Sequence, residues 1–282
     1  MYTSNSIYQG GRVLHSFRFD NVEFTVDLEN DFYGADYWNR VSRSEYEPDT
    51  LDFLRRNCSA GTLFMDIGAA NGAMTLIAGS LGSTVYSYEP DPRMFNVTKR
   101  NVELNSHLKT KISVVNRALA ANQDEIIFSQ GSNQNVLSNI VFSGDRGDNT
   151  LKVQVTALRD ELESIHKDTS NLVIKMDIEG AEWGILGDER TVNSLHSHQA
   201  KILLAVHPGF HRPHKKIMPG INRIIFELWR FKNYREARKL FNRLSESATI
   251  KRTNLNPITD SRIFASLCLV GYHEFVIDFR KI

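Results

Sequence analysis

The 282-residue chain has little cysteine and no long hydrophobic run. Its two cysteines, Cys58 and Cys268, are too few for a disulfide framework or a zinc site, so we expect a reducing compartment, the cytoplasm. No apolar run approaches the roughly 18 residues of a membrane span, and residues 1–11 lack the basic and apolar regions of a secretion signal. We therefore expect neither a membrane-spanning segment nor export by a visible signal.

The chain also lacks an excess of charge of either sign. With 34 lysines and arginines against 33 acidic residues, its formal net charge is +1, whereas dedicated nucleic-acid-binding proteins show a strong basic excess. We expect no nucleic-acid partner. The 41% of hydrophobic residues can form a sizeable core, and the length requires no second folded domain.

Strand patterns and helix patterns alternate along most of the chain. Apolar strands are expected at 62–67, 84–88, 111–115, 171–176 and 201–206. Helices are expected between them, and continuous apolar strands are typical of a sheet that is buried on both faces. The alternation predicts an α/β fold with a mostly parallel, doubly wound sheet.

Both ends of the chain add β structure to this plan. Residues 18–26 alternate in polarity and predict an N-terminal hairpin outside the main sheet, within a β extension or lid at 1–48. The main domain is then expected at 49–282, with a helical insertion at about 215–248. Residues 265–279 predict an antiparallel C-terminal hairpin, with strands at 265–272 and 274–279 and a turn at Gly271.

A turn of small residues follows the first apolar strand, in the sequence Thr62-Leu-Phe-Met-Asp-Ile-Gly-Ala-Ala-Asn-Gly72. Gly68 and Gly72 let the backbone turn tightly and let a ligand approach without meeting a Cβ atom. The amides at the start of the next helix would face that ligand. Such a turn more often has a structural role than a binding role, and the next motif favours binding.

A carboxylate follows the second strand. Glu89 comes roughly 20 residues after Asp66, the spacing at which a βαβ unit holds a ribose diol, because one carboxylate accepts two hydroxyl hydrogen bonds. The alternative is a solvated loop acid or a charge at a helix N-terminus. A nicotinamide fingerprint needs its second and third glycines where the chain has Ala70 and Ala73, so a nicotinamide reductase is disfavoured.

Three separated motifs resemble the FkbM-type methyltransferase family, whose usual loop is D-[IV]-G-A-N-x-G, followed by E-P and then by K-[IM]-D-[IV]-E-G-x-E. The chain has Asp66 to Gly72, Glu89-Pro90 and Lys175-Met-Asp-Ile-Glu-Gly-Ala-Glu182, and the resemblance covers roughly 47–207. The chain departs from the family at Ala70, where the family has asparagine, and has Asn71 one position later. A small residue at position 70 still clears the backbone.

The resemblance implies a seven-stranded Rossmann-like methyltransferase sheet, S-adenosylmethionine (SAM) as cofactor, and a sugar hydroxyl of a glycan, glycolipid or natural product as acceptor. It assigns the methionine moiety to the loop, the ribose to Glu89 and the border of the adenine to residues 116–118. The cofactor-binding residues are then Asp66, Gly68, Ala70, Asn71, Gly72, Glu89, Asn116 and Asp177. Transfer to another small hydroxyl or carboxyl group is an alternative, and so is an inactive SAM-binding partner subunit, which only the Ala70 departure supports.

A hydroxyl acceptor must lose its proton to a base or to a metal-bound group. The candidates follow the strands at 171–176 and 201–206: Asp177, Glu179, Glu182 and His207. His207 is the first choice, because histidine titrates near about 6.5 whereas aspartate titrates near about 3.9. Asp177 is expected to orient the cofactor or the acceptor, with Glu179 as a further candidate.

The segment 207–216 contains three histidines and several basic residues. Its prolines exclude a helix and no acid lies within it, so we expect no histidine metal site and activity that survives chelation. The alternative is a hard cation held by Asp177 with Glu179. A loop that binds a phosphate or a carboxylated sugar fits the composition better.

The longest helical pattern spans 221–246, with apolar residues on related faces and seven lysines and arginines. A solvated basic face over a packed apolar face is the simplest interpretation. The alternative is a contact with a second copy in a homodimer, with another partner or with a membrane surface.

Overall fold

The computed structural model describes residues 5–9, 12–29, 31–122, 126–129, 139–141, 150–165, 171–178, 182–207, 219–253, 256–270 and 273–280. Its main sheet contains β4 (Leu63–Ile67), β5 (Thr84–Tyr88), β6 (Ile112–Val115), β12 (Leu172–Met176), β13 (Lys201–Val206), β14 (Thr249–Arg252) and β15 (His273–Asp278). The strand order is β14-β15-β13-β12-β4-β5-β6, and only β15 runs antiparallel to its neighbours. The predicted mostly parallel, seven-stranded α/β sheet is confirmed.

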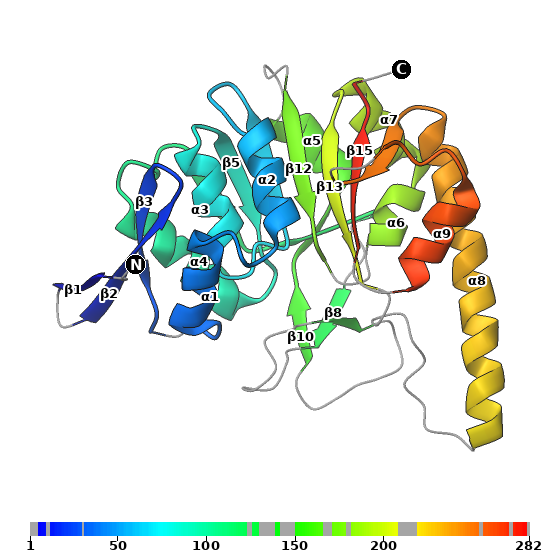
Figure 1. Ribbon diagram of the computed structural model, residues 1–282, viewed down its shortest axis with the longest axis horizontal. Coiled ribbons are helices and arrows are strands. Elements are labelled where there is room, and N and C mark those ends of the chain that lie inside the picture. The colour runs from blue at the N-terminus through cyan, green and yellow to red at the C-terminus, as the bar shows by residue number, and fades with distance from the viewer. Residues whose placement is uncertain are drawn as a thin grey trace.

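Helices cover both faces of this sheet (Figure 1). One face carries α2 (Pro48–Asn57), α3 (Ala73–Ser80) and α4 (Pro92–Leu104), and the other carries α5 (Leu158–Ile165), α6 (Glu182–Gly187) and α7 (Glu189–Ser197). Along β4, Leu63 and Met65 enter the cluster beneath α5 and α7, whereas Phe64 enters the cluster beneath α2 and α3. This alternation explains why the strands read as continuous apolar runs.

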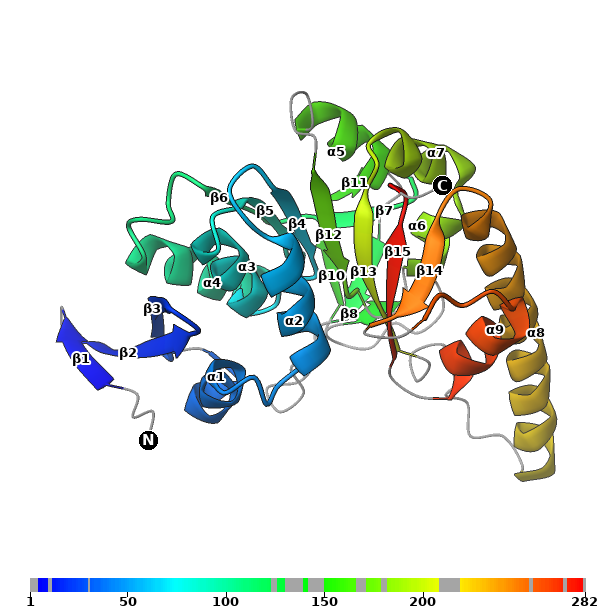
Figure 2. The ribbon, with the colours of Figure 1, turned by 45° about the horizontal axis from the view of Figure 1, so that its top comes forward.

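The N-terminal segment forms its own antiparallel sheet of β1 (Asn5–Gln9), β2 (Arg12–Phe19) and β3 (Val22–Asp27), followed by α1 (Gly34–Ser42). The predicted hairpin outside the main sheet is thus confirmed, and Figure 2 shows this sheet beside α3 and α4. Phe24 and Trp38 pack into the core of that face. The division into an extension at 1–48 and a domain at 49–282 stays a prediction.

Two small sheets follow β6. One pairs β7 (Ala118–Ala120) with β11 (Val155–Ala157), and the other contains β8 (Ile126–Ser129), β9 (Asn139–Val141) and β10 (Thr150–Val153). Figure 1 shows β8 and β10 below the main sheet, at the edge where the parallel strands end.

The C-terminal part contains α8 (Pro219–Ser245), which confirms the long helical pattern, and α9 (Ser261–Leu269). The predicted antiparallel pair is present, but β14 is the partner of β15, and the strand predicted at 265–272 is wrong because α9 occupies 261–269. Asp260 caps α9 by accepting from the Arg262 amide, and Phe264 and Cys268 lie one helical turn apart on its buried face. Gly271 lies outside the described residues. Of the helices described, none has the length and apolar content that a bilayer crossing requires.

Candidate functional site

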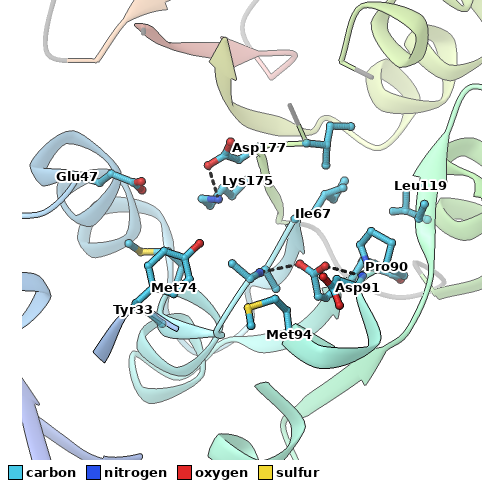
Figure 3. A pocket seen from close by; sticks show the side chains of 18 of the residues that line it. Tyr33, Glu47, Ile67, Met74, Pro90, Asp91, Met94, Leu119, Lys175 and Asp177 are labelled. Atoms are coloured by element: carbon cyan, nitrogen blue, oxygen red, sulfur yellow. Dashed lines mark hydrogen bonds and ion pairs between the residues drawn. The ribbon is translucent and has the colours of Figure 1, made fainter. Parts of the chain in front are cut away.

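A cavity of about 190 Å³ lies at the carboxyl edge of the sheet. Its walls come from the loop after β4, the loop after β5, residues 117–119 after β6, the ends of β12 and β13, and α1 with the segment that joins it to α2. Figure 3 shows Tyr33, Glu47 and Met74 on one side, and Pro90, Asp91 and Leu119 on the other. Open α/β sheets bind ligands at this edge.

The loop after β4 adopts a backbone that requires glycine. Gly68 and Gly72 have φ of +85° and +83°, and a Cβ atom on Gly68 would lie 2.0 Å from the backbone oxygen of Asp177. Ala70 also has a positive φ, +49°. Its amide donates to Glu89 Oε2 at 2.8 Å and its carbonyl accepts from Thr98 Oγ1 at 2.6 Å, so two bonds hold the strained residue in place.

Glu89 lines the cavity at the end of β5. Its Oε2 accepts from the Ala70 amide and its Oε1 from the Asp91 amide, both at 2.8 Å. Each carboxylate oxygen keeps a further acceptor position. Burial raises the pKa of Glu89 to about 8, although the two amides act against this shift. The structure therefore holds a carboxyl group whose oxygens keep lone pairs available to a ligand in the cavity.

A charged cluster lies at the ends of β4 and β12. Lys175 Nζ donates to Asp177 Oδ2 at 3.2 Å and lies 4.0 Å from Asp66 Oδ1. Lys175 is 5% exposed and Asp66 is 0% exposed. Burial alone would lower the pKa of Lys175, but the carboxylates of Asp177, Asp66 and Glu47 raise it above its ordinary value. Burial raises the pKa of Asp66.

His207 follows β13 and meets this cluster. Its Nδ1 lies 3.5 Å from Asp177 Oδ1. Burial lowers the pKa of His207, while Asp177 acts in the opposite direction and Lys175 adds to the lowering. The ring is therefore neutral at pH 7 and can accept a proton.

The predicted site residues divide into two groups. Gly68, Ala70, Glu89, Asp177 and His207 line the cavity together.

Four others lie elsewhere in the described structure. Asp66 is beneath the cavity and accepts from Thr75 Oγ1 at 2.6 Å, while Asn71 is buried and its Nδ2 donates to Asp31 Oδ2 at 3.4 Å. Asn116 Nδ2 donates to the backbone oxygens of Glu89 and Pro90, which holds the loop after β5. Gly72 precedes α3 as its N-cap.

Two further predictions concern the segment after β12. Glu182 is buried and its Oε1 accepts from the Ile178 amide at 3.3 Å, at the start of α6. Glu179 and the segment after His207 lie outside the described residues. Within the described ranges, no group of three histidine, cysteine or acidic side chains is placed to hold a metal. Survival of activity in chelator stays a prediction.

No pattern in the sequence indicated the wall that α1 and the segment after it form. Tyr33, Tyr37 and Tyr46 line the cavity, and the centroid of the Tyr37 ring lies 4.8 Å from that of Tyr33 and 4.7 Å from that of Tyr46. Glu47 lies beside them at the start of α2. The acid before Pro48 was a usable signal for a helix start. Its place in the cavity wall depends on long-range packing, which no local pattern shows.

The comparison with protein-family models identifies one family. The sequence model of the methyltransferase FkbM domain matches residues 66–244. No curated protein sequence matches the chain.

Among solved structures, a TehB-like SAM-dependent methyltransferase from Corynebacterium glutamicum is 10% identical with a TM-score of 0.40, over 89% of this chain and 97% of that one. An rRNA methylase from Streptococcus thermophilus is 8% identical with a TM-score of 0.40, over 82% and 93%. A human methyltransferase 10 domain containing protein is 12% identical with a TM-score of 0.41, over 83% of each chain. These resemblances are distant, and the family match carries the assignment.

Proposed function

The chain belongs to the methyltransferase FkbM domain family and is a SAM-dependent methyltransferase, and we propose that it methylates a hydroxyl group of a sugar in a glycan, glycolipid or natural product. The observation that carries the proposal is the pairing of His207 with Asp177 beside a cavity that fits the cofactor. A small hydroxyl or carboxyl acceptor of another kind is the alternative.

The residues of the cavity fit SAM. Gly68 lets the loop after β4 approach the backbone of Asp177 where a Cβ atom would clash, and both residues line the cavity. Glu89 presents open acceptor positions for two ribose hydroxyls, and Met94 and Leu119 offer apolar contacts for a base. When bound, SAM supplies an electrophilic methyl group together with its own leaving group.

The protein must then align the acceptor and remove its proton. Alignment supplies most of the rate advantage of such a transfer. We assign proton removal to His207, whose ring is neutral at pH 7, and we assign to Asp177 the stabilisation of that ring once it is charged. The three tyrosines provide a wall on which the apolar face of a sugar can pack.

The test measures SAM binding and single-turnover methyl transfer to an accepted glycan, found by screening labelled SAM against a carbohydrate panel. His207→Ala should keep its SAM affinity and lose about 10²- to 10⁴-fold in rate, and Asp177→Asn should impair both. His196→Ala, on the exposed side of α7, is the matched control. Transfer by His207→Ala at the wild-type rate contradicts the assignment, and a panel without any accepted sugar contradicts the substrate class.

We also propose that the protein acts in the cytoplasm. Cys58 and Cys268 are free, buried thiols, which supports action in the reducing cytoplasm.

A further inference from the structure

Glu47 lines the cavity apart from the His207–Asp177 pair and from Glu89. It is half-buried, it precedes α2, and it lies upstream of the matched segment 66–244. Its side chain points across the cavity toward Lys175 (Figure 3).

The backbone holds Glu47 in an unfavourable conformation. Its φ of 43° and ψ of 58° are left-handed, and Pro48 follows it directly. A non-glycine residue pays a steric cost in this region, and a following proline disfavours helical conformations further. Such strain persists where the surrounding structure fixes it, and it clusters at binding and catalytic sites.

The charges around Glu47 do not balance. Lys175 is already shared between Asp177 and Asp66, at 3.2 Å and 4.0 Å. Among the described residues Glu47 forms no ion pair within 4.0 Å, and Tyr46 is its hydrogen-bond partner. Burial raises the pKa of Glu47 to about 7, with Lys175 acting against the shift and Asp177 and Glu274 adding to it. This end of the cavity therefore carries an excess of carboxylates and favours a cationic ligand group.

The shape of the cavity indicates which ligand group arrives there. Pro90, Asp91 and Leu119 lie on the side opposite Glu47 (Figure 3), and Glu89 directly precedes Pro90 in the loop after β5. If Glu89 holds the ribose, as the proposed function has it, the adenine occupies the side of Leu119. The amino-acid end of the cofactor then reaches Glu47 and Lys175.

We propose that Glu47 and Lys175 recognise the two charges of that amino-acid end: Glu47 accepts from the ammonium group, and Lys175 donates to the carboxylate. Lys175 has three N–H donors: one donates to Asp177 Oδ2 at 3.2 Å, and Asp66 Oδ1 lies 4.0 Å away, beyond hydrogen-bond distance. The inference rests on the proposed function, since it takes SAM as the ligand.

Calorimetry with truncated ligands tests this assignment without an acceptor. 5′-Methylthioadenosine keeps the adenine, the ribose and the sulfur of SAM but lacks the amino-acid end. Glu47→Gln should weaken SAM binding about 10- to 100-fold, the range of one charged hydrogen bond, and leave binding of 5′-methylthioadenosine within about twofold of wild type. Glu45→Gln, an exposed neighbour outside the cavity, should bind both ligands as the wild type does.

A second ligand tests Lys175. Decarboxylated SAM keeps the ammonium group and lacks the carboxylate, so the wild type should bind it at least about tenfold more weakly than SAM. Equal affinity for these two ligands removes Lys175 from the proposal.

Two outcomes overturn the role of Glu47. The first is unchanged SAM affinity in Glu47→Gln. The second is an equal loss of affinity for SAM and 5′-methylthioadenosine, which would indicate a structural role at the start of α2. A wild-type chain that binds neither ligand contradicts the proposed function itself, and the Glu47 assignment with it.

Discussion

At the scale of single residues, Lys175 holds two carboxylates together under the cavity. Lys175→Met would leave Asp66 fully buried beside Asp177 with no cation within 4.0 Å among the described residues. Removing one partner of a buried ion pair costs about 3 to 5 kcal/mol. We expect the lower half of this range at pH 7, because Asp177 is partly exposed and solvent screens its charge.

The cost should depend on pH. Burial already raises the pKa of Asp66, and loss of Lys175 raises it further, so the folded variant binds a proton that the unfolded chain has released. A raised carboxyl pKa favours the folded state at low pH, and the stability deficit should shrink as pH falls from 8 to 5. Urea unfolding across this range measures it, and a deficit that grows toward pH 5 would contradict the arrangement.

The strained backbone of Ala70 predicts that a glycine at this position stabilises the protein. Its φ of +49° costs an L-residue about 1 to 2 kcal/mol, and glycine adopts that conformation freely. After the greater entropy of unfolded glycine is subtracted, Ala70→Gly should raise the free energy of unfolding by about 0.5 to 1 kcal/mol. Ala69→Gly is the matched control, since Ala69 has no positive φ and should lose stability. Equal losses in both variants would show that position 70 is unstrained.

The sequence predicted the glycine turn and Glu89 because both follow from the chemistry of a strand end. It could not show which way polar side chains point. Asn71 turns toward Asp31, which is distant in the sequence, and Glu47 reaches the cavity only because α2 begins over the carboxyl edge. Long-range packing decides both, and no local pattern records it.

At the scale of elements, α8 has two unlike halves. Ala237, Leu240 and Leu244 are buried in the main core, whereas Leu228 and Phe231 are 64% and 63% exposed. Figure 1 shows the first half of the helix extending beyond the body of the molecule. The predicted packed apolar face is therefore confirmed for the second half.

This contrast gives a paired prediction. Leu244→Ala should lower the free energy of unfolding by about 2 to 5 kcal/mol, because it leaves a cavity in the core. Leu228→Ala should stay within about 0.5 kcal/mol of wild type. Urea denaturation of the two variants measures both values. A large loss for Leu228→Ala would mean that another surface, such as a second copy, covers it.

The strands of the main sheet and the helices between them were predictable because strand patterns and helix patterns alternate regularly there, with turn residues between them. The segment 265–272 was not, since a short apolar run fits a strand or a helix equally well. Asp260 and Ser261 before that run were the signal for a capped helix.

At the scale of the whole molecule, we expect methyl transfer to require no metal ion. Methyl transfer by the purified chain should persist in excess EDTA, because His207 is assigned to accept the proton. Loss of turnover with rescue by magnesium would contradict this prediction and make Asp177 a metal ligand. Manganese and calcium, added separately after dialysis, control for nonspecific effects.

The central claim is that the cavity at the carboxyl edge binds SAM with Glu89 on the ribose. Isothermal titration calorimetry of the wild type and of Glu89→Ala with SAM, S-adenosylhomocysteine and NADH tests it most directly. The wild type should bind the first two and not NADH, and Glu89→Ala should lose about 1.5 to 3 kcal/mol of binding free energy for both. Unchanged affinity in Glu89→Ala, or binding of NADH in place of SAM, would contradict the account.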